Sequence, residues 1–264
     1  MGRVIAIANQ KGGVGKTTTA VNLAASLAAA ERRTLLVDVD PQANSTKGLG
    51  ISLEEGSPTM YQVLIGESDL EGVLRPTELS CLQLAPSDRD LIGAEIELVG
   101  EEGRERRLRV ALEPQRDRFD YVLLDCPPSL GLLTLNALVA ADTLLVPVQC
   151  EYYALEGVSE LMQTYHSVHE ALNPGLALEG ILLTMYDERT NLCRQVAENL
   201  RAFFKPGEVF ETLVPRNVRL GEAPSFGKPA LLYDIRSRGA EAYLSLAREM
   251  LSREVVAREA EGAR

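Results

Sequence analysis

A glycine-rich segment near the start of the chain limits the possible fold more than any other feature of the sequence. Residues 9–18 read NQKGGVGKTT and lie between an apolar run, 4–8, and a stretch rich in Ala and Leu, 17–30. A continuous apolar run is typical of a buried parallel strand, and the Ala-rich stretch is typical of a helix. The segment therefore predicts a strand, a tight loop and the start of a helix.

The loop has the residues that phosphate binding requires. Its glycines let successive backbone N–H groups point inward, and the helix N-terminus adds a partial positive charge. Lys16 can reach the β- and γ-phosphates of a nucleotide, and the Thr17 hydroxyl is placed to bind a Mg²⁺ that bridges them. A plain turn before a helix would not need Lys and Thr at these offsets. The expected nucleotide-binding residues of the loop are Gly12, Gly13, Val14, Gly15, Lys16, Thr17 and Thr18.

The first residues of the loop depart from the usual P-loop pattern. That pattern has a glycine five residues before Gly15, where this chain has Gln10. The match is to the deviant form K-G-G-x-G-K-T, which begins with a second lysine, Lys11.

Two acids end the next apolar run along the chain. Asp38 and Asp40 follow Thr34 and the residues LLV, and Pro41 comes next. On an extended strand the two acids face the same side, at the carboxyl end where α/β sheets bind ligands. We expect them to act on Mg²⁺ and the attacking water. The alternative is that they only cap the end of a strand.

A third acidic strand end follows later. Residues 119–125 read FDYVLLD, and a terminal acid of this kind, Asp125, holds the hydration shell of Mg²⁺ in Walker B elements. The stiff turn Cys126–Ser129 comes next and is expected to sense the nucleotide, with a plain turn as the alternative.

Length and composition favour one large α/β domain spanning residues 1–264, with a C-terminal helix at about 239–259 and a frayed tail at 260–264. No run of about 18 apolar residues is present, so we expect no membrane span and no signal peptide. The four cysteines are far apart, which favours reduced thiols over a metal cluster. His166 and His169 are expected to be surface residues, because no third metal ligand accompanies them.

The charge distribution bears on nucleic-acid binding. The net charge of −11 argues against a general affinity for phosphate backbones. Residues 184–238, however, hold nine Lys or Arg against seven Asp or Glu, so this region carries +2 and the remainder −13. Any DNA-binding surface must therefore be local.

Taken together, these motifs give the sequence a resemblance to the ParA/MinD superfamily of deviant Walker A ATPases, and within it to the chromosomal partitioning ATPases of the ParA/Soj type. The resemblance covers nearly the full chain. The segments that carry it are NQKGGVGKTT (9–18), DVDPQ (38–42), DCPPSLGLLT (125–134), QCEYYALEG (149–157), PRNVRLGEAPSFGKP (215–229) and YDIRSRGAEAY (233–243).

The resemblance implies a doubly wound, mostly parallel sheet flanked by helices, and an ATP- and Mg²⁺-dependent homodimer with the nucleotides between the subunits. Lys11, which has little to do within its own subunit, would reach the phosphates of the partner and neutralise developing charge there. Asp40 would activate water, and Thr17, Asp38 and Asp125 would serve the metal.

The resemblance also implies three further functions of the protein. Pro215 and Asn217 would contact adenine, and Arg189 and Arg219 would contact double-stranded DNA without sequence preference once the dimer forms. A ParB-type protein would stimulate hydrolysis and release the dimer from DNA. The expected location is cytoplasmic and nucleoid-associated, without membrane binding.

Two other functions remain open at this stage. A MinD-like ATPase that cycles on the membrane would need a basic amphipathic C-terminal helix, but the tail 252–264 carries three Glu against three Arg and has little apolar face. A metal-cluster reductase or scaffold would need cysteines at a dimer interface, for which Cys126 is the candidate nearest the nucleotide.

Overall fold

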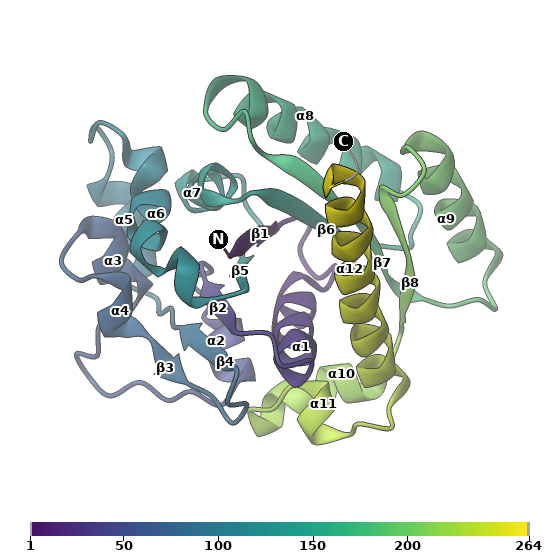
Figure 1. Ribbon diagram of the computed structural model, residues 1–264, viewed down its shortest axis with the longest axis horizontal. Coiled ribbons are helices and arrows are strands. Elements are labelled where there is room, and N and C mark those ends of the chain that lie inside the picture. Colours follow the sequence, from purple (N-terminus) through teal and green to yellow (C-terminus); the bar gives the residue numbers. More distant parts are fainter. Residues whose placement is uncertain (1, 263–264) are drawn as a thin grey trace.

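An eight-stranded sheet lies between two layers of helices (Figure 1). The computed structural model describes residues 2–262, and side chains as far as Val255. The strand order is β3-β4-β2-β5-β1-β6-β7-β8, and every neighbouring pair is parallel except β3 with β4. This confirms the predicted doubly wound, mostly parallel sheet. The strands are β1 (Arg3–Ile7), β2 (Thr34–Asp38), β3 (Arg75–Pro76), β4 (Leu82–Ala85), β5 (Tyr121–Asp125), β6 (Thr143–Gln149), β7 (Ala177–Tyr186) and β8 (Val209–Pro215).

Helices connect the strands and cover both faces of the sheet (Figure 1). The α-helices are α1 (Lys16–Ala29), α2 (Asn44–Gly48), α3 (Met60–Ile65), α4 (Leu70–Val73), α5 (Leu91–Glu97), α6 (Arg107–Leu112), α7 (Leu132–Ala140), α8 (Ala154–Ala171), α9 (Asn191–Phe203), α10 (Val218–Glu222), α11 (Ala230–Tyr233) and α12 (Arg238–Gly262). Three 3₁₀ segments are η1 (Arg104–Arg106), η2 (Glu113–Arg118) and η3 (Ala223–Phe226).

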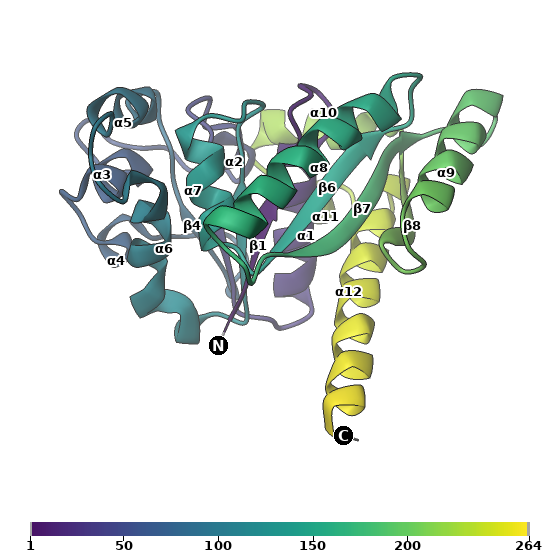
Figure 2. The same cartoon turned by 90° about the horizontal axis from the view of Figure 1, so that it is seen from above.

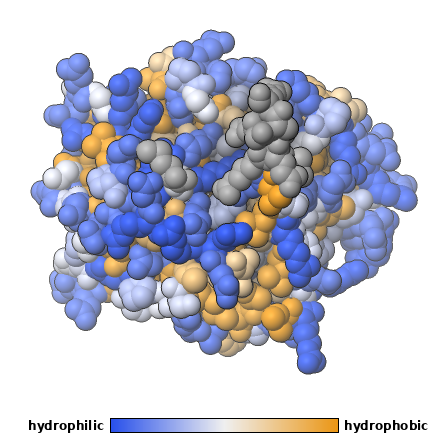
Figure 3. Space-filling view, viewed as in Figure 1, coloured by the Kyte–Doolittle hydropathy of each residue, from blue (hydrophilic) through white to orange (hydrophobic). Residues whose placement is uncertain are grey.

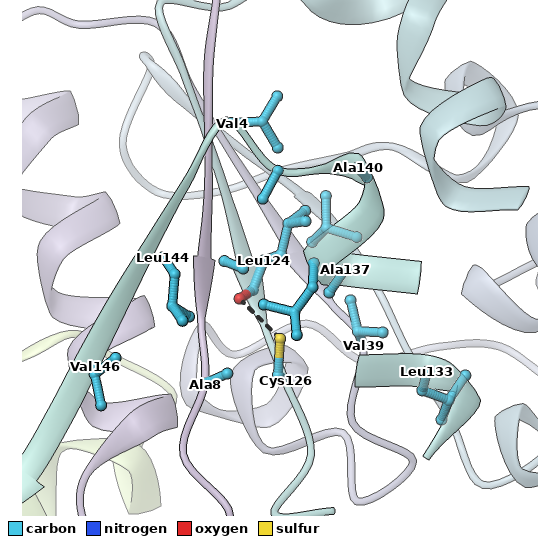
Figure 4. Packing of buried hydrophobic residues seen from close by; sticks show 14 of the residues in the cluster. Val4, Ala8, Val39, Leu124, Cys126, Leu133, Ala137, Ala140, Leu144 and Val146 are labelled. Carbon is cyan, nitrogen blue, oxygen red and sulfur yellow. Dashed lines mark hydrogen bonds between the residues drawn. The ribbon is translucent and has the colours of Figure 1, made fainter. Parts of the chain in front are cut away.

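The central strands are apolar on both faces because a separate core lies on each side of them. Val4 and Ala6 of β1 pack in the core that includes α7 and α8, while Ile5 and Ile7 pack in the core that includes α1 and α12. Successive side chains of a strand point to opposite faces, so a strand with two covered faces needs a continuous apolar run. Figure 4 shows part of the first core, in which Cys126 is surrounded by apolar side chains.

Strand register brings three predicted motifs together at the carboxyl ends of the central strands. Ile7 is level with Asp125 across β1 and β5, and Asp38 is level with Asp125 across β2 and β5. The glycine-rich loop leaves β1 at the same edge. Both ends of the described chain lie on the opposite side (Figure 2).

Several predicted elements differ from the observed ones. The helix expected at 104–116 is divided into η1, α6 and η2, and Pro114, which has no N–H to donate, lies where α6 gives way to η2. No sequence pattern predicted α9, the short helices α2, α10 and α11, or the antiparallel strand β3. The last helix starts at Arg238 and continues through Gly262, so the predicted tail at 260–264 is helical over its first three residues, and residues 263–264 lie outside the described part.

The surface seen in Figure 3 is mostly hydrophilic. An apolar area lies at the bottom of that view, where Figure 1 places α10 and α11, and exposed Val218, Phe226, Leu232 and Ile235 belong to this part of the chain. Within residues 2–262, no helix contains an apolar stretch long enough to cross a bilayer.

Candidate nucleotide-binding site

The glycine-rich loop takes a conformation that requires glycine at two positions. Gly13 has a φ of 75° and Gly15, the residue before α1, has a φ of 91°. Side chains with a Cβ rarely adopt this left-handed region. Asn9 fixes the start of the loop, since its Oδ1 accepts a hydrogen bond from the Lys11 N–H (3.0 Å) and its Nδ2 donates to the Pro147 carbonyl (2.8 Å).

Lys16 lies under the loop and is almost fully buried. Its Nζ donates a hydrogen bond to the carbonyl of Lys11 (3.0 Å), which aims the ammonium group back along the loop. Burial lowers the pKa of Lys16, and the carboxylates of Asp125 and Asp40 act in the opposite direction. A cation held in this way is suited to bind the phosphates of a nucleotide.

Lys11 forms an ion pair with Glu151, which lies just beyond the end of β6. Both side chains are partly exposed. The expectation that Lys11 has little to do within its own subunit was therefore wrong for this conformation. The error arose because Glu151 is distant in sequence and reaches the loop only through the parallel arrangement of β1 and β6.

Asp125 ends β5 and is completely buried. Its Oδ2 accepts a hydrogen bond from the Ser45 hydroxyl (2.7 Å), whereas its Oδ1 lacks a partner of normal geometry among the described residues. Burial raises the pKa of Asp125, and the neighbouring Asp38 raises it further, while interactions with the Ser45 and Thr17 hydroxyls oppose the rise. A buried carboxylate that has one oxygen without a well-formed hydrogen bond, and that lies beside the Thr17 hydroxyl, fits the hydration shell of a divalent cation.

Asp38 is equally buried, but its oxygens are occupied. Its Oδ2 accepts hydrogen bonds from the N–H and the hydroxyl of Thr46 (2.8 Å each), and its Oδ1 accepts one from the Asp40 N–H (3.2 Å). Burial raises the pKa of Asp38, and these hydrogen bonds lower it. The predicted metal-binding role of Asp38 stays a prediction, and in this structure the carboxylate anchors α2.

Asp40 lies between β2 and α2 and is 6% exposed. Its Oδ1 accepts a hydrogen bond from the Gln42 N–H (2.9 Å), so the carboxylate also orders the turn that follows it. Ala43, at the end of this turn, has a φ of 53°. Strain of this kind in a residue with a Cβ persists where the surroundings hold it, as they often do at functional sites.

A cavity of about 250 Å³ adjoins the loop on the side of β8. Pro215 and Asn217 line it together with Gly15 and Thr18 of the loop. Met185 also lines it, and its φ of 49° marks a second strained position. The two residues predicted to contact adenine therefore lie in one cavity with the phosphate loop.

The two residues predicted to contact DNA are exposed and already paired with carboxylates. Arg189 binds Asp187 through two side-chain hydrogen bonds (2.9 and 2.7 Å). Arg219 contacts Glu222 at 2.7 Å and Asp234 at 3.4 Å. Free guanidinium groups are therefore not available at these two positions without rearrangement.

Five residues of the site were not identified from the sequence: Asn9, Ser45, Thr46, Glu151 and Thr184. The last of these donates its hydroxyl to the Val14 carbonyl (2.8 Å) and so supports the loop from β7. Asn9, Ser45 and Thr46 lie within ten residues of a motif, so a search of the flanking polar residues could have found them. Glu151 and Thr184 gave no local signal.

The thiols and imidazoles of the described residues form no metal centre. Cys126, Cys150 and Cys193 are buried, Cys81 is partly buried, and all four are free. His166 and His169 each bond a backbone carbonyl. Over the described part of the chain, no group of three or more His, Cys, Asp or Glu side chains is arranged to hold a metal ion.

Comparison with known proteins agrees with this geometry. The family model described as an AAA domain matches residues 2–178. The chain is 59% identical to the chromosome partitioning protein ParA of Myxococcus xanthus, over 96% of this chain and 89% of that protein. It is 54% identical to the sporulation initiation inhibitor protein Soj of Bacillus subtilis, over 95% and 98% of the two chains.

A solved structure agrees over the whole chain. The protein named cobyrinic acid a,c-diamide synthase from Mycobacterium smegmatis, solved with ADP and magnesium, is 38% identical with a TM-score of 0.83 and covers 100% of this chain and 97% of its own. The extent and level of identity to the partitioning proteins decide the assignment. The chain belongs to the ParA/Soj family of P-loop ATPases within the ParA/MinD superfamily.

Proposed function

We propose that this protein is an ATPase of chromosome segregation that forms a dimer around ATP and Mg²⁺, binds double-stranded DNA without sequence preference as that dimer, and leaves DNA when a ParB-type partner stimulates hydrolysis. The observation that carries the proposal is the arrangement of two lysines in one loop. Lys16 is buried beneath the loop, whereas Lys11 is partly exposed and pairs with Glu151. Lys16 binds the nucleotide of its own subunit, and Lys11 is available to contact the nucleotide of a second subunit.

The residues at the carboxyl ends of the strands have distinct functions in this proposal. Lys16 and the N–H groups of the loop bind the phosphates, Thr17 and Asp125 hold the hydrated cation, and Asp40 orients the attacking water. Mg²⁺, when bound, neutralises charge on the β- and γ-phosphates. Lys11 from the second subunit adds a positive charge where the transition state develops negative charge.

Exposed apolar side chains near Lys11 support the proposal that a second subunit binds there. Tyr152 and Tyr153 directly follow Glu151, the partner of Lys11, and are 78% and 63% exposed. Large exposed apolar side chains near one site are typical of interaction surfaces. A second copy that delivers Lys11 would cover them.

The main test compares two substitutions in the ATPase assay. Lys16→Ala removes the buried cation and should abolish nucleotide binding. Asp40→Ala should retain ATP binding, lose hydrolysis, and accumulate an ATP-bound dimer that stays on DNA. Hydrolysis at the normal rate by Asp40→Ala would show that the water-activating residue has been assigned wrongly.

DNA binding is tested separately over a salt series. Wild type, Lys16→Ala and Arg219→Glu are compared with and without ATP. The proposal expects binding only by wild type with ATP, with a steep loss as salt rises, because each dimer carries two copies of a small basic cluster. ATP-independent binding of equal strength by all three proteins would refute a dimer-dependent DNA site.

The MinD-like alternative depends on the C-terminal tail. The described side chains end at Val255, so the side chains of Val256, Arg258, Glu259 and Glu261 are outside the described part, as is the whole of Arg264. Co-sedimentation with anionic liposomes tests it, and ATP-dependent pelleting with lipid but not with DNA would favour the membrane function. Iron analysis of the purified protein tests the metal-cluster alternative, which the burial of Cys126 among apolar side chains does not favour.

A further inference from the structure

The short helix α2 directly follows the Asp40 turn but cannot hold its own position. It has only five residues, and isolated helices of that length are unstable. No side chain caps its start, where Ala43 has the strained φ of 53°. Contacts with the rest of the protein must therefore fix α2 and, with it, the turn that carries Asp40.

Thr46 makes the densest set of these contacts. Its N–H and its hydroxyl both donate to Asp38 Oδ2, at 2.8 Å each. The same hydroxyl oxygen accepts a hydrogen bond from the Ser87 N–H (3.1 Å), which lies just beyond β4. All three residues are at most 3% exposed, so water does not compete for these bonds.

Asp38 passes this constraint on to Asp40. The Asp40 N–H donates to Asp38 Oδ1 (3.2 Å), the oxygen that Thr46 leaves free. Thr46 therefore fixes the Asp38 carboxylate, and the fixed carboxylate orients the backbone of Asp40. Ser45 makes a parallel contact to Asp125, so adjacent residues of α2 are bound to the two buried acids.

We propose that Thr46 is a positioning residue for hydrolysis, which acts through Asp38 to hold Asp40 in place. The inference rests on the proposed function, in which Asp40 orients the attacking water. The hydroxyl group is the essential part of Thr46, because it donates to Asp38 and accepts from Ser87 at the same time. A misplacement of a catalytic group by about 1 Å can cost on the order of 100-fold in rate.

The test uses three single variants of the full chain. Thr46→Val keeps the shape but loses the hydroxyl, Thr46→Ser keeps the hydroxyl, and Thr34→Val is the matched control. Thr34 is a buried threonine at the other end of β2, and its hydroxyl donates to the Arg32 carbonyl (3.0 Å). For each variant we would measure kcat, KM for ATP, the Kd of a non-hydrolysable ATP analogue and the melting temperature.

We expect Thr46→Val to lower kcat by about tenfold or more while the Kd of the analogue stays within about twofold. Thr46→Ser should recover most of the rate, and Thr34→Val should keep it. Two results would overturn the inference: a wild-type kcat in Thr46→Val, or a loss in Thr46→Ser as large as in Thr46→Val. If Thr46→Val is too unstable to assay, Thr46→Ala replaces it, since it also lacks the hydroxyl; a wild-type kcat in Thr46→Ala would equally overturn the inference.

A double variant tests whether Thr46 acts through Asp38. If it does, Thr46→Val combined with Asp38→Asn should lose no more rate than Asp38→Asn alone, whereas independent effects would multiply. A multiplied loss would refute the connection. Failure of the proposed function looks different, because the wild-type protein itself would then not hydrolyse ATP, or Asp40→Ala would do so at the normal rate.

Discussion

Lys11 of the phosphate loop and Glu151, just after β6, form an ion pair within one subunit. A lysine that must reach the phosphates of a partner cannot keep this contact. The structure therefore shows Lys11 held within its own chain, and the proposed dimer would have to exchange Glu151 for phosphate oxygens. Both side chains are partly exposed as a whole, although the Glu151 oxygen in the pair is buried.

Replacement of Glu151 should favour the dimer. Glu151→Gln removes the competing carboxylate, so we expect ATP-dependent dimerisation at a several-fold lower ATP concentration, measured by analytical ultracentrifugation. Glu156→Gln is the matched control, because Glu156 is exposed near the start of α8 and also loses one negative charge. An equal shift in both variants would mean that net charge alone is responsible, and no shift in either would mean that the pair does not restrain Lys11.

The close approach of Gly50 and Gly227 should make substitution there costly. Gly227 has a φ of 64°, and a Cβ on it would lie 2.6 Å from the Gly50 Cα, a backbone atom that cannot turn away. We expect Gly227→Ala to lower the free energy of unfolding by about 2–4 kcal/mol in urea titrations, because strain and overlap add.

The control for this substitution is Gly157→Ala. Gly157 is within α8, and a Cβ there meets no atom within 4 Å. Alanine favours helix over glycine, so this change should stabilise the protein by up to about 1 kcal/mol. Similar destabilisation by both changes would show that the contact between Gly50 and Gly227 has no special cost.

The sequence was sufficient to predict the central strands and the elements next to them. β1, β2 and β5 were predictable because burial on both faces demands unbroken apolar runs, and the acids at the ends of β2 and β5 marked the carboxyl edge. Local signals were also missed. Thr190 accepts a hydrogen bond from the Cys193 N–H as the cap of α9, and buried residues recur along that helix at helical spacing.

Other features depend on tertiary structure and had no local signal. The contacts of Lys11 with Glu151, of Ser45 with Asp125 and of Thr46 with Ser87 join segments that meet only after the sheet has formed. The loop motif predicted that Lys11 was unusual but could not say which residue holds it in a single subunit. The pairs of Arg189 with Asp187 and of Arg219 with Glu222 are different, because the partners are only two and three residues apart and so had a local signal that a charge count does not register.

Release of Arg189 should strengthen DNA binding. The guanidinium of Arg189 holds the pKa of Asp187 at about 2, so the pair persists at any physiological pH. Asp187→Asn removes the carboxylate charge and leaves the arginine free for phosphate. We expect the ATP-bound protein to bind DNA several-fold more tightly at low salt, by fluorescence anisotropy, with the difference fading as salt rises. The matched control is Glu188→Gln, which removes one negative charge from the neighbouring exposed position and leaves the pair of Arg189 with Asp187 intact. An equal gain in both variants would assign the effect to net charge and not to Arg189.

The buried pair of Asp38 and Asp125 should make the protein without nucleotide less stable as the pH rises. Burial raises the pKa of both acids above the ordinary value; the charge of Asp38 raises that of Asp125 further, and the charge of Asp40 does the same for Asp38. The unfolded chain then loses these protons at lower pH than the native state does, so the native state binds more protons and its stability falls from about pH 4 upward until both raised pKa values are passed.

Asp125→Asn should remove most of this effect while it abolishes hydrolysis. The amide keeps an oxygen to accept the Ser45 hydroxyl but carries no charge, so the variant should unfold at a higher temperature than wild type at pH 8 and at nearly the same temperature at pH 4. The free energy of unfolding is expected to rise by an amount on the order of 1–3 kcal/mol at the higher pH. Buried charges that a protein needs for function often lower its stability in this way. Thermal unfolding without nucleotide at several pH values measures it. A gain that does not vary with pH would show that the pKa of Asp125 is not raised in the native state.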